Sequence, residues 1–86
     1  MIAETIVFRD LEQLLLGMGF HSFLTPQGYR AITHDSSDTI FLMPNYAAEE
    51  PLAWQHLATV RRMLDERGLM TGDEFDRFVD ATRVIA

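Results

Sequence analysis

The sequence predicts a small α+β fold in which one helix precedes a three-stranded antiparallel sheet and two helices follow it. Three observations lead to this order. Apolar residues recur at helical spacing near the start of the chain, short strand-like runs separated by turn residues extend from Phe20 to Pro44, and helical spacing returns after Glu49. The 86 residues suit one domain, so we expect a single domain over residues 1–86.

The first helix is predicted over residues 4–18. Its apolar face consists of Val7, Leu11, Leu14, Leu15 and Met18. These residues recur three or four positions apart, which is the spacing of one buried helix face. Gly17 and Gly19 end the helix, because glycine adopts the left-handed backbone conformation that terminates many helices.

Three strands are predicted between residues 20 and 43. They are the runs FHSFLT, YRAITH and TIFLM, which are rich in β-branched and aromatic residues. The tripeptide PQG separates the first two strands and DSSD the last two, and both are composed of turn-forming residues. Pro44 closes the third strand because proline cannot donate to a sheet ladder. Connections this short favour an antiparallel meander.

Two helices are predicted after the sheet. The second helix opens at Glu49-Glu50-Pro51, since acids and proline suit the first turn, and it stops at Gly68. Thr71 and Glu74 form a capping box, in which each side chain accepts a bond from the other residue's backbone N–H. The third helix is therefore predicted to begin just after Thr71.

Composition narrows the classes of function. The chain has no cysteine, which excludes a disulfide framework and a thiolate metal site. Its net charge is −6, and nucleic-acid affinity rests largely on neutralising phosphates, so the charge disfavours RNA and DNA as partners. No apolar run approaches the roughly 20 residues of a membrane span. We expect a cytoplasmic protein with no membrane contact and no cofactor.

Turn lengths give a first hypothesis for the strand register. A four-residue second turn pairs Ile32 with Phe41, and a two-residue first turn pairs Phe23 with Arg30. On this register the face against the helices consists of Phe20, Leu24, Tyr29, Ala31, Ile40 and Leu42. The opposite, uncovered face consists of His21, Phe23, Arg30, Ile32, His34, Phe41 and Met43.

The uncovered face has two interpretations. Four apolar residues on one exposed face are typical of a dimer or partner interface. Aromatic residues beside arginine and histidine also stack bases and hold phosphates in single-stranded RNA sites. On both interpretations the predicted binding residues are Phe23, Arg30, Ile32, His34, Phe41 and Met43.

Catalytic and metal-binding candidates are few. His34 and Arg30 are the candidate catalytic residues, although His34 is expected to be solvated beside its polar turn. His21 would be a second proton carrier if it shared a face with His34, and His56 is assigned to the surface of the second helix. The four acids between positions 73 and 80 suit the first turns of a helix, so no metal site is predicted.

Five stretches of the chain carry a family resemblance. They are LEQLLLGMGF, QGYRAITH, TIFLMP, LATVRRMLDERGL and TGDEF. In this order and spacing, over about residues 10–78, the chain resembles the HicA family of small ribonuclease toxins. The resemblance implies a fold like the double-stranded-RNA-binding domain, mRNA interferase activity, and a HicB-like antitoxin as the partner in a toxin–antitoxin pair.

The chain departs from the family at its signature. The family has Gly-Ser-His, whereas here Gly28 is followed by Tyr29 and Arg30. Imidazole exchanges a proton near neutral pH, but a guanidinium stays charged and is a poor base. We therefore expect a diverged, non-catalytic domain whose uncovered sheet face binds a second copy or a HicB-like partner. The alternatives are an RNA-cleaving toxin that uses His34, an RNA-binding module, and a purely structural module.

Overall fold

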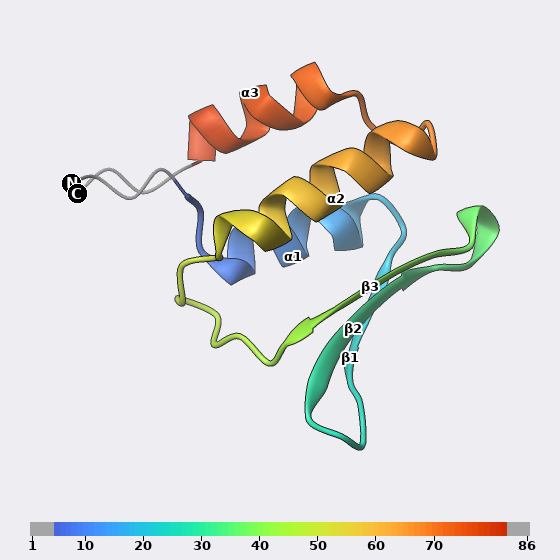
Figure 1. Ribbon diagram of the computed structural model, residues 1–86, viewed down its shortest axis with the longest axis vertical. Helices are drawn as coiled ribbons and strands as arrows, with labels where there is room; N and C mark the ends of the chain where they lie inside the picture. Colours follow the sequence, from blue (N-terminus) through green and yellow to red (C-terminus); the bar gives the residue numbers. More distant parts are fainter. Residues whose placement is uncertain (1–4, 83–86) are drawn as a thin grey trace.

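The computed structural model describes residues 5–82. Its elements are α1 (Phe8–Gly17), β1 (His21–Leu24), β2 (Tyr29–His34), a 3-10 turn (Asp35–Ser37), β3 (Thr39–Pro44), α2 (Trp54–Glu66) and α3 (Gly72–Thr82). The strands form one antiparallel sheet in the order β1-β2-β3. This succession of helix, three-stranded sheet and two helices confirms the predicted fold class (Figure 1).

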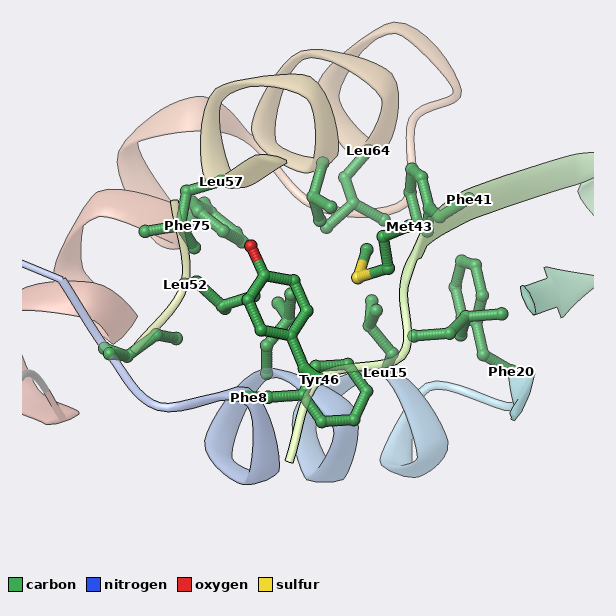
Figure 2. Close-up of a cluster of buried hydrophobic side chains, with 14 residues drawn as sticks. Phe8, Leu15, Phe20, Phe41, Met43, Tyr46, Leu52, Leu57, Leu64 and Phe75 are labelled. Atoms are coloured by element: carbon green, nitrogen blue, oxygen red, sulfur yellow. The ribbon is translucent and has the colours of Figure 1, made fainter. Parts of the chain in front are cut away.

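The helices cover one side of the sheet. α1 packs against β1, α2 packs against β3, and α3 packs against α2 (Figure 1). The core between these layers consists of Ile6, Phe8, Leu11, Leu15, Phe20, Ile32, Phe41, Met43, Tyr46, Leu52, Leu57, Val60, Leu64 and Phe75 (Figure 2). Within residues 5–82, no helix combines the length and the apolar character that crossing a bilayer requires.

The start of α1 differs from the prediction because a distant segment caps it. α1 begins at Phe8 rather than at position 4, and its N-cap residue makes no side-chain cap. The N–H groups of Phe8 and Arg9 donate to the carbonyls of Glu50 and Ala48, both at 2.9 Å. The first turn of any helix leaves such N–H groups unpaired. Here backbone carbonyls from the loop before α2 satisfy two of them.

The same loop delays the start of α2. The prediction of a helix opening at residues 49–51 is wrong, since α2 begins at Trp54. Pro51 forms an isolated antiparallel bridge with Val7, and the N–H of Leu52 donates to the carbonyl of Ile6 at 2.9 Å. An extended backbone is required for this pairing, so these residues cannot be helical.

The start of α3 agrees with the prediction. The Thr71 N–H donates to Oε1 of Glu74 at 3.0 Å, and the Glu74 N–H donates to Oγ1 of Thr71 at 3.1 Å. This reciprocal pair is the predicted capping box. α3 is also joined to α2 by an ion pair between Arg61 and Asp76 at 2.8 Å.

Candidate protein-binding surface

The first hairpin has a longer loop than the sequence suggested. The Thr25 N–H donates to the carbonyl of Tyr29 at 2.7 Å, which leaves a three-residue loop that ends in Gly28 at a φ of +90°. Three-residue hairpin loops commonly end in a left-handed glycine. Phe23 therefore lies opposite Ala31, and the predicted pairing of Phe23 with Arg30 is wrong by one residue.

The second hairpin has the predicted register, yet its faces are reversed. Ile32 pairs with Phe41 and Arg30 with Met43, as expected. However, Phe41 and Met43 are buried against the helices, whereas Ile40 and Leu42 are 59% and 61% exposed. The prediction that Ile32, Phe41 and Met43 lie on the uncovered face is therefore wrong. β3 is apolar on both faces, so its alternation does not indicate which face the helices cover.

The uncovered side of the sheet is apolar and uncharged. Strand pairing places the following residues on it, and together they are called the open face: His21, Phe23, Tyr29, Ala31, Thr33, Ile40, Leu42 and Pro44. Four of the large side chains are about half or more exposed, with Phe23 and Tyr29 at 50% and 49%. None of the eight is an acid, an arginine or a lysine. The open face is therefore mainly apolar, and His21 and Tyr29 are its only titratable side chains.

Arg30 lies on the helix-covered side of the sheet. Its partner Met43 is buried, and Arg30 itself is half-buried. Its Nη2 donates to Oδ1 of Asn45 at 3.3 Å, while its Nε is buried without a hydrogen-bond partner. The guanidinium is thus not presented on the open face with Phe23, contrary to the prediction.

His34 also lies on the covered side, and the expectation that it is solvated is wrong. Its ring packs on Phe20 with centroids 4.8 Å apart. Its Nδ1 lies 2.6 Å from Oγ of Ser37, which in turn lies 2.7 Å from Oγ1 of the fully buried Thr39. His21 is exposed on the open face, so the two histidines cannot act as a pair.

The other titratable residues considered as candidates make contacts that stabilise the fold. His56 is not a plain surface residue, because its Nδ1 hydrogen-bonds to the Tyr46 hydroxyl at 2.6 Å. The Glu74 carboxylate accepts hydrogen bonds from Thr71, which lower its pKa, and the Arg61 guanidinium lowers the pKa of Asp76. No three His, Asp or Glu side chains gather closely enough to hold a metal in the described part of the chain.

A groove separates β3 from α2. It has a volume of about 140 Å³ and is lined by Ile40, Phe41, Leu42, Met43, His56, Thr59, Val60 and Met63. No pattern in the sequence indicates this groove, and the prediction that Tyr29, Ile40 and Leu42 lie against the helices is wrong. Recognising Gly28 as the end of a three-residue loop would have corrected β1, but only the packing of α2 places the groove.

No family model, no curated protein and no solved structure matches this chain. Among residues 5–82, Phe23, Tyr29, Ile40 and Leu42 form the largest group of exposed apolar side chains on a single face.

Proposed function

We propose that this chain is a diverged HicA-like domain that binds a protein through its open face and does not cleave RNA. The observation that carries the proposal is the uncharged open face, with Phe23, Tyr29, Ile40 and Leu42 exposed side by side. Together they expose on the order of a few hundred Å² of apolar surface, which approaches the largest patch of a typical soluble monomer. Such patches commonly mark protein–protein interfaces.

The charge distribution favours a protein over RNA as the partner. A surface that binds nucleic acid needs cations beside its aromatic residues to neutralise phosphates. The open face has no arginine, and the whole chain has a net charge of −6. Its chemistry instead matches an apolar, uncharged protein surface.

The signature position supports binding without catalysis. Arg30 replaces the family's histidine, and it is half-buried on the covered side beside Asn45. A guanidinium does not act as a general base near neutral pH. His34 has its Nδ1 engaged with Ser37 and its ring packed on Phe20. Neither residue supports the alternative of an RNA-cleaving toxin.

The HicA resemblance, carried by stretches such as QGYRAITH and TIFLMP, supports an antitoxin-like protein as the partner, acting in the cytoplasm. The test is to co-express the chain with the product of the adjacent gene and to measure the affinity of the purified pair by titration calorimetry. We expect Phe23→Asp to weaken the complex at least about tenfold, because it places a charge in an apolar contact. Leu16→Asp is the matched control, since Leu16 is an exposed apolar residue of α1 away from the open face.

Three results would contradict this proposal. The first is a Phe23→Asp variant that binds its partner as tightly as the parent protein does. The second is a tight, salt-sensitive complex of the unmodified chain with RNA, which would assign the open face to nucleic acid. The third is cleavage of RNA by the purified chain.

A further inference from the structure

The free edge of the sheet has backbone groups that no other strand occupies. β3 is an outer strand, paired with β2 on one side only. In an antiparallel pair, successive residues point their N–H and C=O groups alternately toward the neighbouring strand and away from it. The bond between Thr25 N–H and Tyr29 C=O shows that Tyr29 faces β1. Ala31 and Thr33 share this orientation, so Arg30, Ile32 and His34 face β3.

It follows that two residues of β3 face outward. Phe41 pairs with Ile32 and exchanges backbone bonds with it, so the flanking Ile40 and Leu42 direct their N–H and C=O groups to the outer edge. Within residues 5–82, no other backbone group hydrogen-bonds to these four outward groups.

This edge has little of the protection that proteins usually give to outer strands. Charged side chains, bulges and internal prolines normally block edge-to-edge pairing. The segment TIFLMP has no charge, and its proline stands at the last position. The α2 residues that line the adjacent groove, His56, Thr59, Val60 and Met63, include no acid, arginine or lysine. On a chain with a net charge of −6, the edge and groove thus form an uncharged strip.

We propose that β3 pairs antiparallel with β3 of a second copy, with the two-fold axis passing beside Phe41. In this register Ile40 lies opposite Leu42 of the second copy, and Leu42 lies opposite its Ile40. Each pair exchanges two N–H to C=O bonds, so the edges share four. The two three-stranded sheets become one continuous six-stranded sheet.

Competing antiparallel registers form fewer bonds. Centring the axis on Ile40 places Leu42 opposite Asp38, whose N–H bonds to Asp35 and whose carbonyl accepts from Arg67. Centring it on Leu42 places Ile40 opposite Pro44, which has no N–H. The Pro44 carbonyl already accepts from the N–H of Tyr46. Each of these registers retains only two bonds, so the Phe41-centred register is the one that β3 specifies.

Side chains favour the same arrangement. Ile40 and Leu42 are the most exposed apolar residues of the sheet, and the pairing sets each beside the other on the open face. Apolar cross-strand neighbours of this kind stabilise antiparallel pairs. The edge pairs through backbone groups and the open face binds through side chains, so the inference goes beyond the proposed function and does not depend on it. One copy of the chain would pair through the β3 edge with a second copy and would bind another protein through the open face.

The test uses the full chain and measures both its mass and its amide exchange. Sedimentation equilibrium from micromolar to near-millimolar concentration should show a reversible dimer that tightens as salt screens the net charge of the two copies. In the dimer the amide protons of Ile40 and Leu42 should be protected from exchange with solvent, and dilution should remove the protection. The amides of Phe41 and Met43 bond within the chain and should be protected in both states.

A variant pair isolates the backbone bonds. Leu42→Pro removes one outward N–H per copy, and proline is tolerated at an edge position whose N–H faces away from the sheet. It should raise the dimer Kd about tenfold or more, because it removes two of the four bonds. Leu42→Val keeps the N–H, replaces one apolar side chain by a β-branched one that suits a strand, and should retain the dimer. Phe23→Asp, on the far strand of the open face, should also leave the Kd within about twofold.

Three results would overturn the proposal. A monomer throughout the concentration range would exclude self-pairing. A dimer in which the Ile40 and Leu42 amides exchange freely would assign the contact to another surface. An undiminished dimer in the Leu42→Pro variant would exclude the β3 backbone as its source.

Discussion

The hydroxyl of Tyr46 lies 2.6 Å from Nδ1 of His56 and accepts the backbone N–H of Ala53 at 3.0 Å. Tyr46 follows β3 and stacks on Phe8 of α1, with its hydroxyl directed toward α2 (Figure 2). Ala53, the N-cap residue of α2, makes no side-chain cap of its own. The hydroxyl therefore serves as a tertiary cap for α2 and is also hydrogen-bonded to His56.

Tyr46→Phe should destabilise the fold although it preserves the ring. The change removes the hydrogen bonds to the Ala53 N–H and to Nδ1 of His56, and a partly buried hydrogen bond contributes about 0.5–1.5 kcal/mol. Urea titration followed by circular dichroism measures the free energy of unfolding. Tyr29→Phe is the matched control, because Tyr29 is an exposed tyrosine of the open face. Equal stability of the two variants would contradict the capping role.

Thr71→Ala should cost about 1 kcal/mol in the free energy of unfolding, the typical loss for an N-cap. The substitution removes the hydroxyl that accepts the Glu74 N–H. Thr71→Ser keeps this hydroxyl and should stay close to the parent protein in the same denaturant titration. If Thr71→Ala leaves stability unchanged, the capping box contributes nothing to α3.

Acid should weaken the α2–α3 region through two carboxylates. Hydrogen bonds from Thr71 lower the pKa of Glu74, and the Arg61 guanidinium lowers the pKa of Asp76, from ordinary values of 4.5 and 3.8. Both pKa values are lower in the folded protein than in the unfolded chain. The two carboxylates therefore stabilise the fold fully at a pH above their ordinary pKa values, and this stabilisation is lost as the pH falls through their pKa values in the folded protein.

Removing these two carboxylates should therefore flatten the dependence of stability on pH. The double variant Glu74→Gln, Asp76→Asn should lose less of its unfolding free energy than the parent when the pH falls from about 5 to about 3. Glu66→Gln, at the exposed end of α2, is the control and should follow the parent curve. Parallel curves for all three proteins would show that neither carboxylate contributes.

Arg67 links the end of α2 to the turn before β3 through hydrogen bonds. Its Nη1 donates to the carbonyl of Ser37 at 2.8 Å and to that of Asp38 at 3.1 Å. Arg67→Ala should accelerate amide hydrogen exchange at Asp38, whose N–H bonds to Asp35, since the turn then opens locally. Global stability should change by less than about 1 kcal/mol for an exposed group. Arg62→Ala is the control, because Arg62 is an exposed arginine of α2, and it should leave the exchange of the turn unchanged.

The unmodified protein should leave RNA intact and should not arrest growth when it is expressed. The guanidinium of Arg30 stays charged near neutral pH and cannot act as the base that cleavage requires. Incubation with labelled single- and double-stranded RNA, followed by gel analysis, checks this outcome. Metal-independent cleavage that disappears in a His34→Ala variant would instead assign the chemistry to His34.

Local signals in the sequence were sufficient to predict part of this protein. The order of elements, the Thr71 capping box and the pairing of Ile32 with Phe41 all depend on residues close together in the chain. Caps and short turns are decided by bonds within a few residues, so their outcome can be predicted from composition and spacing. The absence of charge in TIFLMP, which leaves the β3 edge unprotected, can also be read from the sequence alone.

Contacts between distant segments decided the rest. α1 and α2 begin where they do because residues 48–52 bond to residues 6–9, and no local pattern encodes that pairing. β3 offers apolar residues to both sides, so Phe41 and Met43 are buried only because α1 and α2 cover that face. Ile40 and Leu42 are left on the open face for the same reason. Burial depends on what packs against a strand, and the tertiary structure alone determines that.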